Sequence, residues 1–590
     1  MNTRTIDVDF CVVGGGIAGL CAALSAARHG ARVALVQDRP VLGGNASSEV
    51  RMHICGAWGT NRRETGIVEE LLLDNYRYNA GAVWPVFDTV LWSKAIHQPG
   101  LEVVLDASVC SAEMSGSAIR SVKAWQTTTQ TWVEIRARYF ADCSGDAVLA
   151  PLSGAEFRVG REPRGEFGES EAPLDGDRRT MGNSLLMQCQ ERPDPVPFTP
   201  FPWAYDYSQA ENRPWLEGRC IDNRRDNFWW IEIGGCGNTI DDTEDEREEL
   251  LKIVYGVWDY MKNHAPEKAE YANWSLEWVG HLPGKRESRR CIGDHLLTQS
   301  DVQSGGPFED VVAYGGWAID NHYPEGFYHV GAGTKYTNCP SPFGIPFRCL
   351  YSKNVPNLYF AGRNISCTHV ALSATRVMAT CGLEGQAIGT AAAIGCRDRL
   401  DPRDVGKRRL AELQRTLQDD DCFLPGRLRE MRGPCASARL SGDGEGVERL
   451  RDGMERDWDD GDHGWRTAPG GAAEYRFAGP VDLHGARIVF DSNLNRRDRN
   501  RPAPGVDSMM QCRHFRFLED PLYAPPATLV RDFRIEVLNE AGEWTLLDET
   551  KDNFQRLVRI PLNARTRGVR LVPLSTWGAE TCHVFSFEVE

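Results

Sequence analysis

The sequence predicts an α/β protein, in which a Rossmann-like dinucleotide-binding domain carries an inserted α+β substrate domain and is followed by a β-sandwich. Three observations predict this arrangement. A glycine-rich turn joins an apolar strand to a helix near the N-terminus, a second strand and helix occupy residues 355–393, and short alternating runs follow residue 465. The first two features are typical of a parallel sheet covered by helices, and the third of an antiparallel sandwich.

Length and charge limit the classes of protein to consider. A chain of 590 residues is too long for one core, so we expect several domains. The formal net charge of −16 argues against nucleic acid or an anionic membrane as a partner, because both attract a basic surface. No apolar run approaches the ~20 residues that span a bilayer, and the first predicted strand begins close to Met1. We therefore expect a cytoplasmic protein.

The 18 cysteines are scattered, and no Cys-x-x-Cys pair occurs. This spacing favours neither a zinc ribbon nor an iron–sulfur ligand set, so we expect no metal. In a cytoplasmic protein most of these cysteines would be reduced, buried thiols.

The first motif is the glycine turn. An apolar strand at 10–13 runs into Gly14-x-Gly16-x-x-Gly19, and a small-residue helix and a second strand follow. In this pattern the first glycine permits the tight turn, the second lets the backbone approach a pyrophosphate, and the third lets helix and strand pack closely. The strand-turn-helix-strand context predicts a dinucleotide site.

The second strand ends at Gln37 and Asp38, where a carboxylate normally binds the adenosine ribose. Gln37 is a departure, since a neutral amide makes a weaker contact than a carboxylate. The next loop offers exposed backbone N–H groups that suit a diphosphate or the edge of a ring cofactor, with a surface turn as the alternative. Its candidate cofactor residues are Gly43, Gly44, Asn45 and Ser48.

A second strong motif lies at residues 355–393. A strand ends in Gly362 and Arg363, and a helix with many small residues follows from Met378 to Ala393, including Gly385 and Gln386. A helix N-terminus aimed at N1 and the C2 carbonyl of a flavin would stabilise its reduced anion. This pairing indicates flavin more specifically than the first motif does.

The middle region is rich in tryptophan, proline and glycine. We predict a helix beginning with a capping box at Thr243 and Glu246. Residues 228–233 predict a strand with an aromatic face, which more often belongs to a core than to a substrate platform. The charged run at 284–290 predicts a solvated face.

Two segments supply candidate catalytic side chains. Trp317, Asp320 and His322 lie within six positions, as a substrate pocket needs. The loop before the second helix carries His369 and Arg376, candidates for acid–base and anion-binding chemistry. The alternative for the first segment is a structural turn with an incidental histidine, and the alternative for the second is structural hydrogen bonding.

Several of these motifs, taken together, resemble those of a known protein family. The chain over about 5–395 resembles the FAD-dependent oxidoreductases of the glutathione-reductase-like superfamily, and more narrowly bacterial flavoproteins often labelled "FAD-dependent oxidoreductase" or "xanthan lyase". The end of the chain resembles a galactose-binding-like module. The segments that carry the first likeness are 14–19, 43–49, 142–146, 314–317 and 357–363, and the residues that carry the second are Trp544, Asn553, Gln555, Arg556, Trp577 and Gly578.

The resemblance implies FAD as the cofactor. It places the pyrophosphate at the three glycines of the first motif and the ribose at Gln37 and Asp38. It implies a backbone contact of Val109 with adenine and a position of Asp146 near the ribityl chain. At the flavin end it places Gly362, Arg363, Gly385 and Gln386.

Domain boundaries follow from these motifs. We predict that 1–150 and 350–400 form the FAD-binding domain and that 151–349 form the substrate or cap domain. Residues 401–465 are a predicted helical linker, and 466–590 are the predicted galactose-binding-like sandwich.

The leading functional hypothesis is a dehydrogenase or oxidase that takes hydride from a hydroxyl-bearing carbon of a carbohydrate or polyol to flavin N5. His369 is the leading candidate base and His322 the alternative, because a neutral histidine can take the hydroxyl proton. Arg376 would bind a substrate anion or stabilise reduced flavin. His53 would either tether the flavin 8α-methyl group or only line the pocket.

Two other functions stay open. Cys55 could serve a thiol-dependent flavin redox enzyme, or the protein could hold FAD and bind glycan without turnover. No second dinucleotide motif is visible, so we expect oxygen, a quinone or a redox protein as electron acceptor. A homo-oligomer is possible.

Overall fold

The structure is a computed structural model that describes residues 2–219, 221, 227–459, 461–494 and 511–590. The chain forms two compact units, each of which is described by itself. The first comprises residues 1–56, 82–413 and 509–522, and the second comprises 57–81, 414–508 and 523–590. These units do not test the predicted domain boundaries, which stay predictions. Residues 57–81 belong to the second unit and residues 509–522 to the first, although each segment is distant in sequence from the rest of its unit.

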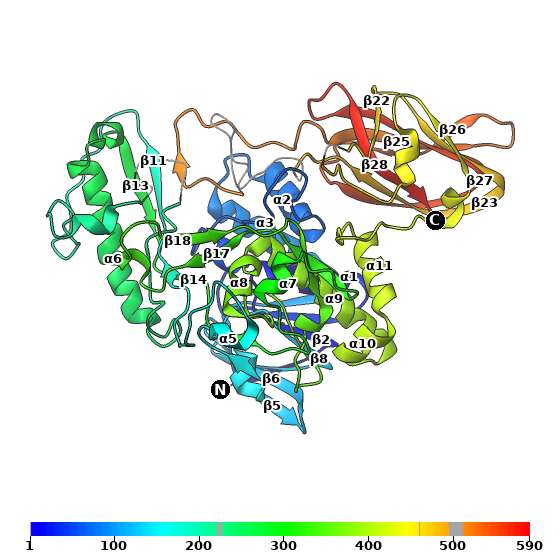
Figure 1. Ribbon diagram of the computed structural model, residues 1–590. Coiled ribbons are helices and arrows are strands. Elements are labelled where there is room, and N and C mark those ends of the chain that lie inside the picture. The colour runs from blue at the N-terminus through cyan, green and yellow to red at the C-terminus, as the bar shows by residue number, and fades with distance from the viewer. Residues whose placement is uncertain (1, 220, 222–226, 460, 495–510) are drawn as a thin grey trace. The chain divides into compact units, whose positions relative to one another are not determined.

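A five-stranded parallel sheet organises the first unit (Figure 1). All its pairings are parallel, and its strands are buried apolar runs, as expected where helices cover a sheet. Both predicted strand-to-helix motifs are confirmed as parts of this sheet. In spatial order the strands are β20 (Leu358–Phe360), β8 (Tyr139–Asp142), β2 (Phe10–Val13), β3 (Val33–Val36) and β4 (Leu101–Val104).

Two helices pack closely beside this sheet. Helix α1 (Ile17–Arg28) follows the first glycine turn, and α9 (Met378–Asp398) follows the second motif. A Cβ atom built on Gly385 would lie 2.0 Å from the carbonyl oxygen of Ala18, and one on Gly389 would lie 2.2 Å from that of Ala22. The two helices therefore approach through their backbones, which only glycine at these positions allows.

A second, smaller sheet has the order β1-β7-β6-β5. The chain passes from the parallel sheet to this one between β4, which ends at Val104, and β5, which begins at Ala107. Asp106 between them has φ 53°, a turn conformation that ends the first strand. The strands are β1 (Thr3–Asp7), β5 (Ala107–Ser115), β6 (Ala118–Gln126) and β7 (Thr131–Arg136).

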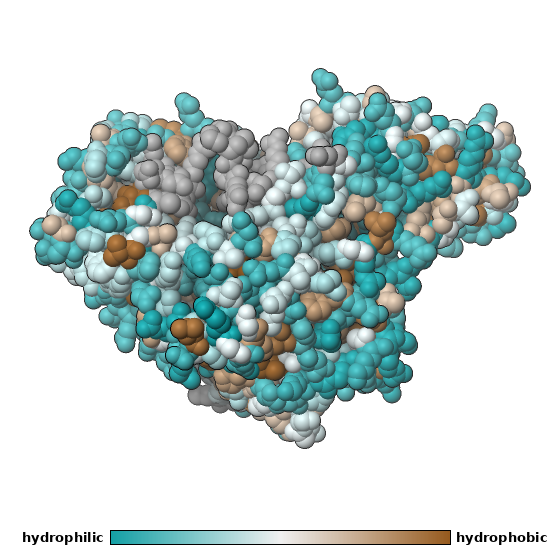
Figure 2. Space-filling view, viewed as in Figure 1, coloured by the Kyte–Doolittle hydropathy of each residue, from teal (hydrophilic) through white to brown (hydrophobic). Residues whose placement is uncertain are grey.

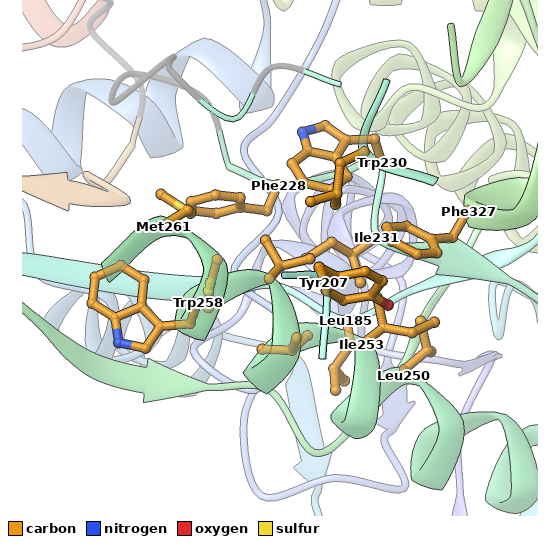
Figure 3. Close-up of a cluster of buried hydrophobic side chains, with 14 of the residues drawn as sticks. Leu185, Tyr207, Phe228, Trp230, Ile231, Leu250, Ile253, Trp258, Met261 and Phe327 are labelled. Carbon is orange, nitrogen blue, oxygen red and sulfur yellow. The ribbon is translucent and has the colours of Figure 1, made fainter. Parts of the chain in front are cut away.

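The region between the two motifs contains helix α6 (Thr243–Asp259) and several small sheets. Its core is a cluster of aromatic and aliphatic side chains around Tyr207, Trp230 and Trp258 (Figure 3). The strands of these sheets are β9 (Phe157–Arg158), β10 (Asn183–Ser184), β11 (Met187–Glu191), β12 (Glu232–Ile233), β13 (Trp274–Val279), β14 (Gly284–Lys285), β15 (Arg290–Cys291), β16 (Val311–Gly315), β17 (Ile319–His322), β18 (Thr334–Thr337), β19 (Phe343–Pro346) and β24 (Phe515–Arg516).

The other helices of the first unit are short, except for α3. They are α3 (Trp84–Ile96), α4 (Leu149–Ser153), α5 (Arg164–Phe167), α7 (Gln299–Gln303), α8 (His369–Thr375) and α10 (Pro402–Arg408).

The predicted strand at 228–233 is wrong over most of its length, since only Glu232–Ile233 forms a strand. Phe228 has φ 57°, which turns the chain and breaks the extended run. Phe228 and Trp230 are both buried in the core of Figure 3, so the interpretation of the aromatic face as core is confirmed.

Helix α6 is confirmed, but its predicted capping box is wrong. The N-cap is Asp242, and Thr243 is already helical, with its hydroxyl donating to the carbonyl of Thr239. The side chain of Glu246 instead turns inward and accepts a hydrogen bond from Asn183, while its Oε1 has no hydrogen-bond partner among the described residues. Burial raises the pKa of Glu246 to about 7.

The second unit is built from one continuous antiparallel sheet and includes α2 (Ile67–Tyr78). The long strands β23 and β27 join it together, and shifts in their register let such strands bend. The predicted antiparallel strands after residue 465 are confirmed, and α11 (Leu410–Asp419) precedes them in the chain. The strands are β21 (Arg439–Gly442), β22 (Trp465–Thr467), β23 (Ala473–Phe490), β25 (Val530–Leu538), β26 (Trp544–Thr550), β27 (Leu557–Thr576) and β28 (Cys582–Val589).

Several residues that suggested a galactose-binding-like module serve the interior of this unit. Arg556 is 2% exposed and pairs with Asp421, with Glu69 also nearby. Asn553 is buried and donates to the carbonyls of Val530 and Gln555. The likeness at these positions therefore reflects packing of the sheet.

The face in Figure 2 is mostly hydrophilic, and its hydrophobic residues occur as scattered spots. Among the described residues, no helix is long and apolar enough to cross a membrane.

The α1–α9 contact predicts an unusual response to alanine. We expect Gly385→Ala to lower the free energy of unfolding by about 1–3 kcal/mol, because the added methyl group overpacks the contact with Ala18. Chemical denaturation followed by circular dichroism measures the change. Gly165→Ala in α5 is the matched control, since a Cβ there meets nothing within 4 Å. Equal stability of the two variants would contradict the backbone contact.

Glu246 predicts a pH dependence of stability. Below about pH 4.5 the carboxyl is protonated in both folded and unfolded chains. Between that pH and about 7 the folded protein keeps a proton that the unfolded chain releases, so stability falls as pH rises. We expect Glu246→Gln to be more stable than the parent at pH 8, by up to about 3 kcal/mol, and no more stable at pH 4. A constant difference across this range would argue against a buried neutral acid.

Candidate active site

The two predicted phosphate loops lie against each other at the end of the parallel sheet. The N–H of Gly43 donates to the carbonyl of Gly15 at 2.8 Å, and Gly16 and Gly43 form a parallel bridge. Gly14 and Gly43 have φ 103° and 107°, values that favour glycine. The loop after β3 thus belongs to the same site as the first turn.

Gln37 braces this turn. Its Oε1 accepts a hydrogen bond from the N–H of Gly15 at 2.6 Å, and its Nε2 donates to the carbonyl of Val41. Gln37 is 5% exposed, whereas Asp38 is exposed. Contact of either residue with a ribose stays a prediction, as does the adenine contact of Val109 in β5.

The glycines of the first motif have different neighbours. A Cβ on Gly14 would lie 2.4 Å from the carbonyl oxygen of Cys143, and one on Gly19 would lie 1.8 Å from that of Gly14. A Cβ on Gly16 would meet only the Cα of Gly44, at 3.9 Å. The fold therefore requires Gly14 and Gly19, while Gly16 faces open space at the N-terminus of α1. This space, with the positive helix end beside it, fits a diphosphate.

An ion cluster follows strand β8. Asp146 accepts from Lys285 Nζ at 2.9 Å and from Arg363 Nη2 at 2.8 Å. Burial alone would raise the pKa of Asp146, but Arg363 and Lys285 hold it well below its usual value. The carboxylate thus ties the segment after β20 to strand β14 beside the parallel sheet. Its position near a ribityl chain stays a prediction.

A buried acid, Glu384, holds the turn after β20 and was not predicted from sequence. The N–H of Gly362 donates to Glu384 Oε2 at 2.8 Å, and none of the described residues hydrogen-bonds to Glu384 Oε1. Burial raises the pKa of Glu384 well above its usual value. The signal in the sequence is one acid within a helix of small residues. Its neighbour Gly385 serves the contact with α1, and the flavin contacts of Gly385 and Gln386 stay predictions.

A group of buried charges surrounds His322. Its Nδ1 lies 2.6 Å from Glu232 Oε2, and its Nε2 lies 3.3 Å from Asp320 Oδ2. Arg376 donates to Asp320 at 2.8 Å, and Arg286 lies 3.3 Å from Glu232. Burial opposes ionisation of both acids. His322 and Arg376 nevertheless lower the pKa of Asp320, and Arg286 and His322 lower that of Glu232.

His369 lies beside this group. Its Nδ1 is 2.8 Å from Glu287, and its Nε2 is 3.1 Å from Oδ1 of Asn321, the residue before His322. Burial would raise the pKa of Glu287, but His369 and Arg290 lower it. Both nitrogens of His369 are thus held in the interior, and the side chain is nearly inaccessible.

His53 and Cys55 reach the same region from the loop after β3. Asn227 donates to His53 Nδ1 at 2.9 Å and accepts from the N–H of Trp229, whose ring lies 5.3 Å from that of His322. The carbonyl of Cys55 accepts from Ala379 in the first turn of α9. His322 and Arg376 both contact Asp320, and His369 contacts the adjacent Asn321. His53 is connected to them through Asn227 and Trp229, and Cys55 through the backbone of Ala379. A catalytic role for any of the five stays a prediction.

The prediction that residues 284–290 form a solvated face is wrong. Glu287 and Arg290 are fully buried, and Arg286 is 9% exposed. Each charge has a partner of opposite sign inside the unit, which lets the run enter the interior. Sequence reasoning missed Glu232, Arg286 and Glu287 because their partners are distant in the chain.

A separate cavity of about 390 Å³ lies in the region between the motifs. Aromatic side chains form much of its wall, including Phe198, Tyr255, Trp258, Trp274 and Trp278.

Two clusters outside the site have a spacing that could hold a metal. They are Asp206–Asp259–His264 and, in the other unit, Asp457–Asp462–His583. Other side chains contact both, for example Asn263 on Asp259 and Arg466 on Asp462.

Comparison with known proteins identifies the class. The profile of a family described as "FAD dependent oxidoreductase" matches residues 9–417, and the chain belongs to this family. It is an FAD-dependent oxidoreductase, and FAD is its cofactor. A search of curated proteins gives no match.

Two solved structures illustrate the structural likenesses. A geranylgeranyl bacteriochlorophyll reductase-like protein from Thermoplasma acidophilum is 12% identical, with a TM-score of 0.32 over 71% of this chain and 85% of its own. The family 32 carbohydrate-binding module of Streptococcus pneumoniae EndoD is 15% identical, with a TM-score of 0.20 over 27% of this chain and 99% of its own. Likenesses this weak carry no argument about function.

Gly16 and Gly19 belong to the same motif, but we expect substitutions at the two positions to have different effects. We expect Gly16→Val to leave the stability of the apoprotein nearly unchanged but to weaken FAD binding by about tenfold or more, because the side chain fills the space for the diphosphate. Gly19→Val should destabilise the apoprotein itself. Flavin absorbance per protein and thermal unfolding without FAD measure the two effects. Normal FAD content in Gly16→Val would contradict this assignment.

Proposed function

We propose that the protein oxidises a hydroxyl-bearing carbon of a small polar molecule, with a carbohydrate or polyol as the substrate class. The observation that carries the proposal is the group of buried charges around His322, beside the N-terminus of α9. FAD, when bound, accepts the hydride from the carbinol carbon while the hydroxyl proton passes to a protein base, leaving a carbonyl product.

His322 is better suited than His369 to handle the hydroxyl proton. Glu232 holds Nδ1 at 2.6 Å, whereas the 3.3 Å contact of Nε2 with Asp320 is long. A carboxylate that fixes one imidazole nitrogen leaves the other to exchange a proton with the substrate. A substrate hydroxyl that displaces the long contact would reach Nε2. His369 would instead position the segment through Asn321.

Arg376 donates to Asp320 and holds it in place, and it lies directly before the N-cap of α9 in the chain. The N-cap of this helix is Val377, whose apolar side chain offers no acceptor. The positive end of the helix would support a cofactor that becomes anionic on reduction. We propose that Gly16, Gly44 and Gly362 lie against FAD, with the Asp146 cluster at its middle.

The thiol hypothesis remains the second candidate, because Cys55 lies at the first turn of α9 through its backbone. Three predictions from the sequence are kept as proposals. They are oxygen, a quinone or a redox protein as the electron acceptor, a homo-oligomeric state and a cytoplasmic location.

Anaerobic reduction of the flavin tests the proposed chemistry. We expect one or more sugars or polyols to bleach the absorbance near 450 nm, and we expect His322→Asn to slow the reduction by about 100-fold or more without loss of FAD. His97→Asn, at an exposed helix end, is the control. Bleaching by thiols alone, abolished in Cys55→Ser, would establish the second candidate instead.

A further inference from the structure

Arg51 is a cation without a matching acid in the loop that leads from Asn45 to His53. It is partly buried, and its guanidinium donates to the carbonyl of Ser48 and to Gln188. Among the described residues, no carboxylate forms an ion pair with it. Glu277 and Asp88 act on it only from a distance, and Glu277 is paired with Arg516 at 3.7 Å.

Two features hold Arg51 in place. Its guanidinium carbon lies 4.2 Å from the centre of the Trp278 ring, a cation–π contact that orients the group. Its backbone has φ 63°, which residues other than glycine rarely adopt and which is often found at functional sites. A long, flexible side chain is thus fixed in one position.

His514 is a second polar side chain that lacks a partner. It is 7% exposed, and neither ring nitrogen has a hydrogen-bond partner in the part of the chain that the structure describes. Its ring lies 6.2 Å from that of His53 and 5.2 Å from that of Trp84. Burial, with His53 and Arg51 nearby, lowers the pKa of His514 well below its usual value, so the ring is neutral.

The chain segment that carries His514 is firmly attached to this loop. Gln511 donates to the carbonyl of Met52 at 3.0 Å and accepts from the N–H of Ile54 at 3.0 Å. The carbonyl of His514 accepts from Cys189, and β24 continues as a parallel neighbour of β11. A segment beyond the matched family range of 9–417 thus completes the surroundings of His53.

We propose that Arg51 and His514 bind a carboxylate group, so that the substrate of this flavoenzyme is a hydroxy acid such as a sugar acid. A carboxylate is a planar acceptor that matches the guanidinium fork, and it would accept an N–H of His514 with its other oxygen. One negative charge would offset the unpaired charge of Arg51 and give the orphaned imidazole a partner. The assignment of this group to the substrate rests on the proposed function.

Matched pairs of acids and neutral alcohols test this inference. The probes are glycolate with ethylene glycol, lactate with propane-1,2-diol, and glucuronate with glucose. Calorimetric titration into the FAD-loaded, full-length protein measures binding directly and needs no turnover. We expect at least one acid to bind about tenfold or more tightly than its neutral partner, because a charge-assisted contact is added.

Variants assign the preference to the residues. Arg51→Gln should abolish the preference for the acid, and His514→Phe, which keeps a ring beside Trp84, should weaken acid binding by about threefold or more. Arg120→Gln is the control and should retain the preference, because Arg120 is exposed in β6 and already pairs with Glu113 at 2.9 Å. FAD content confirms that each variant is folded.

Equal binding of acids and neutral partners, or a preference that survives in Arg51→Gln, would overturn the inference. An acid that binds through Arg51 without bleaching the flavin would support the anion site while contradicting the proposed oxidation. Bleaching by neutral polyols with no preference for acids would support the proposed oxidation and contradict the carboxylate site.

Discussion

Close backbone contacts that leave no room for side chains are the constraint on which the first unit depends. Gly19 lies against the carbonyl of Gly14, and Gly385 lies against that of Ala18. These contacts bring α1 and α9 together and fix where both helices begin. Because a helix start carries a partial positive charge, the same contacts decide where a diphosphate and a reduced flavin can be stabilised.

The interior of the region between the motifs shows how charge can be buried where it has partners. Glu232, Asp320 and Arg376 would each be costly alone in a low-dielectric environment. Arranged around His322, they satisfy one another and hold the imidazole in a fixed orientation. Such a network is rigid but easily disturbed, because removal of one member leaves another buried charge without a partner. Arg51 and His514 stand out against this pattern because neither is matched by an acid.

Residues outside the range that the family profile matches also contact the candidate site. The profile ends at residue 417, yet residues 511–517 lie against the loop that holds His53. Variation in such a segment could alter substrate choice while the cofactor site stays the same, because fold and chemistry are separable.

The sequence by itself determined the parallel sheet, the two glycine motifs, the antiparallel strands near the end of the chain and the cofactor class. These follow from local patterns, in which the spacing of glycines and apolar residues fixes the backbone directly. The tertiary structure decided which charges are buried and which side chains meet. Residues 284–290 have the pattern of a solvated face, and only their distant partners Glu232 and His369 draw them inward. The inward turn of Glu246 and the packing of His514 beside His53 likewise depend on contacts between segments far apart in the chain, which no local spacing encodes.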